Sequence, residues 1–156
     1  MIADMFLKLA GVTGEVQDAD HKGEIRVVGW SWGLSAPTAA VTGQATGKAA
    51  MSELVIVKQV DQATPTLMQY LRHHKPVATA KLTVRKAGTT PLEYFRIELE
   101  QVRITGLTTD TQDTELVEKL KLAFQKVTVT YTPQQSGTGA KGGGEVVFTA
   151  DAHVGN

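Results

Sequence analysis

The sequence contains no cysteine, and its charges leave no excess of either sign. The absence of thiols excludes disulfide bonds, zinc-thiolate centres and a cysteine nucleophile. Sixteen basic side chains match sixteen acidic ones, so the formal net charge is zero. A neutral chain has no overall field that would attract nucleic acid or an anionic membrane. The sequence also lacks the roughly 20 consecutive apolar residues of a membrane span. We therefore expect neither nucleic-acid binding nor membrane insertion.

Signals for several domains or for a secretory leader are also missing. A chain of 156 residues is typical of one domain that buries about 70% of its unfolded surface. We predict a single domain over residues 1–156. Residues 1–6 contain an early acid and lack the basic start and long apolar run of a signal peptide. We expect a protein made in the cytoplasm, with any export proceeding without a cleaved signal peptide.

Aromatic residues are scarce, at 6% of the chain, and the only two tryptophans lie two positions apart. Side chains alternate along a strand, so Trp30 and Trp32 point to the same face. Each indole buries roughly 150–250 Å², and we predict that both anchor the core. The other face of this strand then carries Val27, Gly29, Ser31 and Gly33. Such a thin face suits a wall beside another backbone or an open space, and it equally suits glycines that let a strand bend.

Most of the remaining chain has the alternation or the β-branched runs of strands. We expect strands over residues 5–9, 24–35, 54–57, 80–86, 92–104, a region after residue 113, and 145–150. Thr64 followed by Pro65 indicates a helix with Thr64 as its N-cap, and Pro76 ends that helix. Residues 37–49, rich in Thr, Ala and Gly, predict a long loop, and 134–144 predict a flexible segment.

Two predicted strands change the face that carries their apolar residues. In the first, Phe95, Ile97 and Leu99 share one face, and the apolar set continues on the other face as Val102 and Ile104. In the second, Leu120, Leu122 and Phe124 share one face, and the apolar set continues on the other face as Val127, Val129 and Tyr131. Such a change requires a bulge or a bend, as at the corners of barrels. This favours a closed or nearly closed barrel over a flat sheet. Residues 116–127 also fit the stripe of a helix, so helix and strand both remain open there.

No set of residues fits catalysis, cofactor binding or a metal site. Residues 43–49 resemble a phosphate-binding loop, but they have one residue too few between the glycines and alanine where Ser or Thr belongs. Asp18, Asp20 and His21 lack the remaining ligands of a metal site and indicate a solvated turn.

Other polar side chains have ordinary structural explanations. His73 and His74 are adjacent near a helix end, where they point about 100° apart and cannot easily share a metal. Glu98 and Glu100 share the polar face of a strand with Arg96, which is typical of a solvated or interface surface. We predict a structural or binding protein that is not an enzyme and needs no cofactor.

The order of the motifs resembles one known family. The matching segments are Asp4-Met5-Phe6-Leu7-Lys8, Gly14-Glu15, His21-Lys22, Ile25 through Gly33, Lys81 through Gly88, and Tyr131-Thr132-Pro133-Gln134 with the glycine-rich segment after it. They resemble the Hcp family, the tube protein of the bacterial type VI secretion system. The likeness runs from the first residues to the end and includes most of the predicted strands.

The resemblance implies a mainly β fold, a two-sheet β-barrel with one short outer α-helix, and it favours a strand at residues 116–124. It also implies a homo-hexamer ring and stacked rings that form a tube within a contractile sheath, with a VgrG spike at the tip and secreted effectors in the lumen. The tryptophan strand would then line the channel, with Ser31, Val27, Gly29 and Gly33 facing the lumen and its cargo. The ring-contact loop would include Pro37, Thr38, Gly43, Gly47 and Lys48.

The main alternative function is a monomeric carbohydrate- or ligand-binding β-module. An aromatic residue such as Tyr94 would then lie on an exposed face. An enzyme with a site at the barrel mouth is a weaker third alternative. The mass of the particle in solution separates the first two functions, because a hexamer indicates the tube and a monomer indicates the module.

Overall fold

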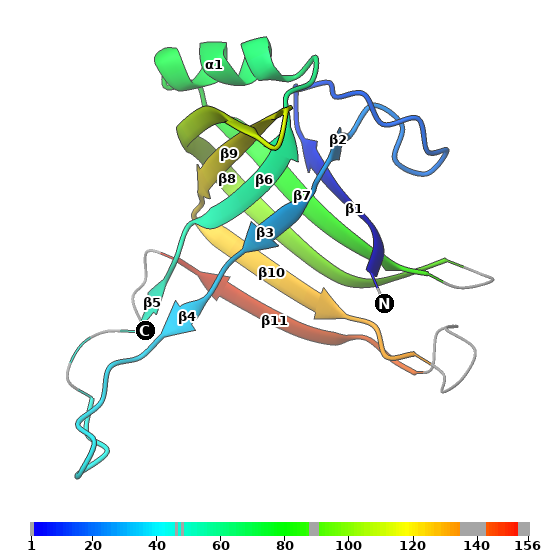
Figure 1. The fold of residues 1–156 in the computed structure, drawn as a ribbon. Helices are drawn as coiled ribbons and strands as arrows, with labels where there is room; N and C mark the ends of the chain where they lie inside the picture. Colours follow the sequence, from blue (N-terminus) through cyan, green and yellow to red (C-terminus); the bar gives the residue numbers. More distant parts are fainter. Residues whose placement is uncertain (1, 46, 48, 88–90, 135–142, 153–156) are drawn as a thin grey trace.

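The computed structural model describes residues 2–45, 47, 49–87, 91–134 and 143–152. These residues form two β-sheets that share one long strand, with a single helix across one end (Figure 1). The elements are β1 (Ile2–Leu9), β2 (Ile25–Arg26), β3 (Gly29–Ser31), β4 (Leu34–Ser35), β5 (Ala50–Met51), β6 (Leu54–Gln59), α1 (Thr64–Arg72), β7 (Val77–Lys86), β8 (Leu92–Gln112), β9 (Glu115–Ala123), β10 (Lys126–Tyr131) and β11 (Val146–Asp151). The expected mainly β fold with one short helix is confirmed. Most of the segment predicted to be flexible, 134–144, lies outside the described residues.

The 21-residue strand β8 belongs to both sheets. Its first half pairs with β7 and β10, which gives the first sheet the order β2-β1-β7-β8-β10-β11. Its second half pairs with β9, and the second sheet continues through β6 to β3. Between the halves, Gln101 has a positive φ of 52°, and the register shifts between Ile104 and Gly106. The change of face predicted in this strand is therefore confirmed as a bulge that turns the corner.

The second predicted change of face is a bend between two strands. β9 ends at Ala123 and β10 begins at Lys126. The N–H of Gln125 donates to the carbonyl of Glu100 (3.1 Å), which fixes the bend to β8. β9 pairs with both β6 and β8, so its backbone groups are satisfied by the sheet. Residues 115–123 are therefore strand, as the family resemblance implied.

The segment from β2 to β3 joins the free edges of the two sheets. β2 pairs with β1, and β3 pairs with β6. Between them the N–H of Val27 donates to the carbonyl of Met5 (3.0 Å), and the N–H of Val28 donates to that of Val57 (2.8 Å). Among the described strands no continuous ladder closes the barrel. The two sheets are therefore not closed into the expected barrel, and this short crossing alone links their free edges.

Helix α1 begins near the predicted residue but is capped differently. Ala63 occupies the N-cap position, and Pro65 lies in the first turn. The Asp61 carboxylate accepts a hydrogen bond from the N–H of Ala63 (3.0 Å). Thr64 is not the N-cap, because its hydroxyl is buried and donates to the Glu118 carboxylate (3.0 Å). The predicted cap is therefore wrong by one residue, and the reason is a buried contact with a distant strand.

The apolar core lies between the two sheets, beneath α1. Its buried members include Leu7, Ile25, Leu54, Ile56, Leu67, Leu82, Ile97, Leu99, Leu120, Leu122 and Val127. They come from both sheets and from the helix, so the core depends on pairing between segments far apart in the chain.

Candidate assembly surfaces and channel wall

The two tryptophans pack inward at the edge of the core. Trp30 stacks on Phe95, with ring centroids 5.6 Å apart, and Trp32 lies 6.4 Å from Phe124. Both indoles are half-buried and pack against the apolar cluster. Ser31, between them, is exposed. The predicted alternation of inward and outward side chains is therefore confirmed within β3.

Val27 was expected to share the exposed face with Ser31, and this expectation is wrong. Val27 is 4% exposed and belongs to the core, whereas Val28 is 54% exposed. The alternation of faces changes here because the backbone leaves β1 and moves to β6 between these two residues. Gly29 is half-buried and Gly33 is exposed, so these two glycines remain compatible with an outward face.

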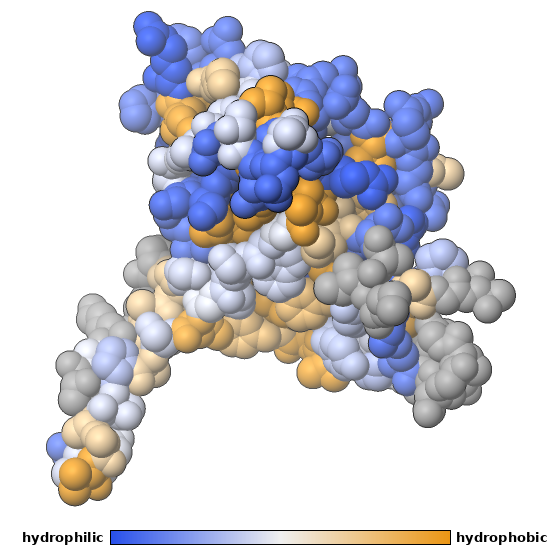
Figure 2. Space-filling view, viewed as in Figure 1, coloured by the Kyte–Doolittle hydropathy of each residue, from blue (hydrophilic) through white to orange (hydrophobic). Residues whose placement is uncertain are grey.

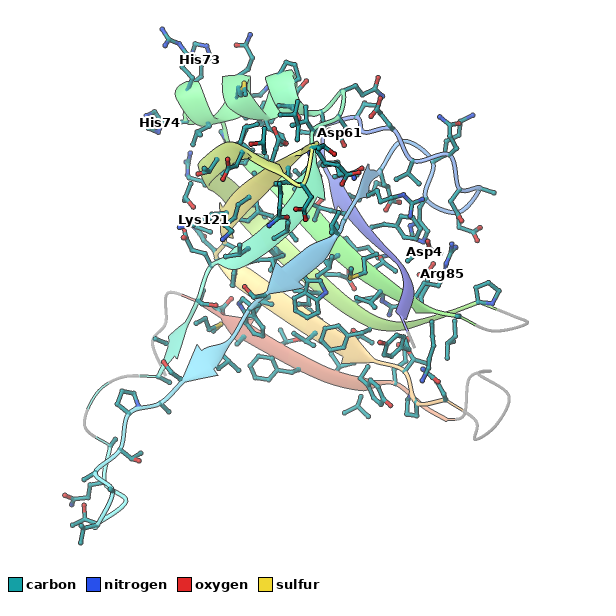
Figure 3. All side chains as sticks on the ribbon, viewed as in Figure 1. Asp4, Asp61, His73, His74, Arg85 and Lys121 are labelled. Carbon is teal, nitrogen blue, oxygen red and sulfur yellow. The ribbon has the colours of Figure 1, made fainter. Side chains whose placement is uncertain are left out.

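The outer face of the second sheet carries small and β-branched residues together with two lysines. Cross-strand pairing aligns two central rows, which we call the second-sheet face: Ser31, Val55, Lys121 and Gly106 in one row, and Gly29, Val57, Lys119 and Thr108 in the other. Side chains directly opposite in an antiparallel pair lie on the same side of the sheet. Figure 3 labels Lys121 beside β6 and β9.

Residues 36–45 and 47, here called the arm, extend away from the two sheets (Figure 1). A bridge between Thr38 and Ala45 makes the arm a narrow hairpin, and Gly43 takes a positive φ of 71° at its turn. Val41 at the tip is 96% exposed. Pro37 lies close to Gly47, where an added Cβ would be 3.4 Å from the proline Cγ. Of the predicted ring-contact residues, Lys48 alone lies outside the described part of the chain.

An apolar cleft of about 500 Å³ lies between the root of the arm and β11. It is lined by Leu34, Ala36, Ala50, Met51, Phe148 and Ala150, among others. β11 pairs only with β10 in the described structure, and its Val146, Val147 and Phe148 are all exposed. Figure 2 shows hydrophobic residues at this end of the molecule and at the tip of the arm. Sequence reasoning found the strand but missed this surface, whose signal is three consecutive apolar residues without alternation.

A charged cluster fastens the loop after β1 to the first sheet. Arg85 donates to the carboxylates of Asp4 (2.8 Å) and Asp18 (2.7 Å), and Figure 3 shows Arg85 beside Asp4. Hydrogen bonds from this guanidinium lower the pKa of both carboxyl groups below the ordinary value, and the two carboxylates raise the pKa of Arg85 in turn. The Phe6 ring lies 5.0 Å from the Arg85 guanidinium carbon. The cluster is a structural clamp.

His21 lies in the same region and is bound on both ring nitrogens. Nδ1 is 3.0 Å from the Glu24 carboxylate, and Nε2 is 2.7 Å from that of Glu93. The imidazole also stacks on Phe6, with centroids 4.2 Å apart. The Asp18 carboxylate accepts a hydrogen bond from Arg85, so it is not placed to share a metal ion with His21. In the described ranges no group of three His, Cys, Asp or Glu side chains has the arrangement of a metal site.

A buried ion pair was not found by sequence reasoning. Lys58 Nζ lies 2.5 Å from Glu118 and 3.1 Å from Asp61, and both Lys58 and the Glu118 side chain are 0% exposed. Thr64 and Thr109 donate to the two oxygens of Glu118. Lys58 lies on the same inward face of β6 as Leu54 and Ile56. A lysine at an inward position of a strand is the sequence pattern that could have indicated a buried ion pair. The pair joins β6, β9 and the start of α1.

The other polar residues considered in the sequence lie at the surface. His73 and His74 extend from the end of α1 (Figure 3) and are exposed. Tyr94 is half-buried, and Lys86 Nζ lies 5.7 Å from its ring centre, so the ring is not an open platform for a sugar. Within the described segments no helix is long and apolar enough to cross a membrane.

Comparison with known proteins shows which family this chain matches. Residues 6–131 match the family model described as "Type VI secretion system effector, Hcp". Protein hcp1 of Pseudomonas aeruginosa is 39% identical over 153 residues, which cover 95% of this chain and 94% of that protein.

Solved structures agree with this match. The structure of a type VI secretion system effector from Yersinia pestis is 31% identical with a TM-score of 0.78, covering 95% of this chain and 99% of that one. Hcp1 from Salmonella typhimurium is 27% identical with a TM-score of 0.80, covering 99% and 98% of the two chains. The fold, the matched motifs and these relatives together show that the chain belongs to the Hcp family of type VI secretion system proteins.

Proposed function

We propose that this protein is the structural tube subunit of a type VI secretion system. A homo-hexamer forms a ring, rings stack into a tube, and effectors travel in the lumen. The tube assembles in the cytoplasm before secretion, inside a contractile sheath and beneath a VgrG spike. Membership of the Hcp family supports this function.

The observation that carries the proposal is the apolar surface that one copy leaves uncovered. The cleft between the arm root and β11 adjoins an edge strand with three exposed apolar side chains. Contiguous apolar surface of this kind marks an interaction site. A free strand edge also offers backbone hydrogen bonds to another chain. A second copy is the occupant that family membership favours.

A ring closes by repeating one heterologous contact, which needs two different complementary surfaces on each subunit. The cleft with β11 supplies one surface. The arm supplies further contact area, because Val41 at its tip is 96% exposed. We assign Pro37, Thr38, Gly43 and Gly47 to contacts between subunits or rings through this arm, and Lys48 belongs to the same loop.

The second-sheet face is the proposed channel wall. Ser31 and Gly29 lie on this face, and Gly33 follows directly after the tryptophan pair. Small residues here keep the bore wide. Ser31 contributes one exposed hydroxyl that can contact cargo.

Ring formation is tested by sizing the purified protein with light scattering and by negative-stain images. We expect hexameric rings without added metal, nucleotide or other cofactor. A particle that stays monomeric at every concentration, with no rings in the images, would rule out the tube function and favour the monomeric binding module.

A further inference from the structure

We propose that Lys119 and Lys121 form a binding band for acidic protein surfaces on the second-sheet face. The inference rests on the proposed function, because it takes this face as the channel wall. It adds the chemical class of cargo that the wall holds.

The two lysines are the only charged side chains in the two central rows. Each row contains one lysine, and its other members are glycine, serine, threonine or valine. Lys119 and Lys121 are both exposed. The neighbouring side chains are short, so the lysines are the longest side chains in the two rows, and both are accessible to an approaching molecule.

Neither lysine is neutralised by its own chain. In the described part of the structure, neither ammonium group forms an ion pair. The aliphatic stem of Lys121 lies over Gly106, where an added Cβ would be 3.4 Å from the lysine Cδ. A supported stem with a free ammonium group is suited to bind a carboxylate from another molecule.

Acidic residues near this face already have hydrogen-bond donors. Glu53 accepts from Thr105, Asp110 from the backbone of Thr111, and Glu115 from Gln59. The outer face of the first sheet differs, because acidic side chains lie among its cations: Arg96 pairs with Glu98 and Glu145, and Lys126 pairs with Glu100. Lys8 and Lys81 form no ion pair among the described residues, but Glu98 lies directly opposite Lys81 in the same row. Rows that contain lysine and no acidic residue are therefore a feature of the second-sheet face.

The neighbours of the lysines favour a protein partner over nucleic acid. Single-stranded nucleic acid is held by aromatic stacking together with basic residues, and the two rows contain no aromatic residue and no arginine. Half-buried Val55 and Val57 lie between the lysines and β3. Valine and threonine beside lysine suit an acidic protein surface that also carries small apolar groups. Repetition around the ring lets several weak contacts act together.

The test uses assembled rings and a ten-residue polyglutamate peptide labelled with tetramethylrhodamine. We expect binding to wild-type rings by fluorescence anisotropy, and weaker binding as salt rises. The double variant Lys119→Gln/Lys121→Gln should bind about tenfold more weakly, because several exposed charge pairs are lost together. The control variant Lys8→Gln/Lys81→Gln removes the same charge from the outer face of the first sheet and should bind within about twofold of wild type. A labelled polylysine peptide should not bind.

The same samples are sized by light scattering, which separates two kinds of failure. Absence of rings in the wild type would overturn the proposed function and this inference with it. Intact rings that bind polyglutamate equally well in all variants would overturn the lysine band alone, as would equal losses in both double variants. Tighter binding of an oligothymidine of equal charge than of polyglutamate would assign the band to nucleic acid and also overturn the proposal.

Discussion

Individual residues in this protein take their roles from the sheet that surrounds them. Lys58 and Glu118 are charged, yet both are fully buried and joined at 2.5 Å. Thr64 donates to the same Glu118 oxygen as Lys58, and Thr109 donates to the other oxygen. A buried pair of this kind stabilises a fold only while both partners and their hydrogen bonds are present. The pair therefore specifies how α1 begins relative to β6 and β9.

Breaking this pair should cost far more than replacing it. We expect Lys58→Met alone to lower the free energy of unfolding by about 3–5 kcal/mol, because Glu118 then remains charged and buried. The double variant Lys58→Met/Glu118→Leu should recover most of that loss, and urea unfolding measures both. A single variant as stable as wild type would show that the carboxylate is solvated or neutral in the folded protein.

Ser31 and Trp30 are adjacent residues with opposite predicted effects. Ser31→Gln should leave ring formation and thermal stability nearly unchanged, because the side chain is exposed, while it alters retention of effectors in the lumen. Trp30→Ala should lower the free energy of unfolding by about 3 kcal/mol, the low end for a truncated aromatic residue because the indole is only half-buried.

Light scattering, thermal unfolding and co-purification of effectors measure these effects. If Ser31→Gln breaks the ring, this face is an interface and not the channel wall. If rings remain intact and effector retention is unchanged, Ser31 does not contact cargo.

At the scale of elements, the loop from β1 to β2 depends on the charged cluster at Arg85. Asp4 and Asp18 have pKa values held below the ordinary range, chiefly by hydrogen bonds from Arg85. A carboxyl group with a lowered pKa stabilises the fold above its unfolded pKa, about 3.9 for aspartate, and loses that contribution as the pH falls through the folded value. The clamp is therefore complete at neutral pH and weakens below about pH 4.

Acid should release this loop, and Asp18→Asn should reduce the effect. We expect the melting temperature of wild type to fall between pH 6 and pH 3 by more than that of the variant, since Asp18 contributes part of the pH dependence. The variant Asp20→Asn serves as the control, because it keeps the backbone N–H that donates to Asp18 and changes only a side chain outside the clamp. Equal pH profiles for wild type and Asp18→Asn would show that the Arg85–Asp18 pair does not stabilise the fold.

Local sequence patterns predicted the strands and the helix well, but they predicted less well which side chains and strand edges are covered by other parts of the chain. The changes of face in β8 and at the bend between β9 and β10 followed from alternation alone, because an apolar set can change sides only at a bulge or bend. The prediction for Val27 was wrong because the backbone passes from β1 to β6 at this point, and that crossing depends on contacts between segments far apart in the sequence. β11 was predicted as a strand, but a pattern within one strand does not show that its second edge is uncovered.

At the scale of the whole molecule, the sheets end in surfaces that one copy does not cover. The chain carries no net charge, so association meets no long-range repulsion. β11 lies at the same end of the molecule as the arm (Figure 1), and its Phe148 and Ala150 line the apolar cleft. We interpret this end as one side of the heterologous contact, with its complement on a different part of the next subunit.

A charge on the exposed edge strand should separate folding from assembly. We expect Phe148→Lys to give a folded monomer, because Phe148 is 43% exposed and lines the cleft, and a lysine there would be desolvated without a partner on contact with another copy. Thr79→Lys, an exposed substitution on β7, should leave the rings intact. Light scattering reports the particle size, and thermal unfolding confirms that each variant is folded. Rings formed by Phe148→Lys at wild-type concentrations would exclude the cleft from the subunit interface and leave the arm as the remaining candidate surface.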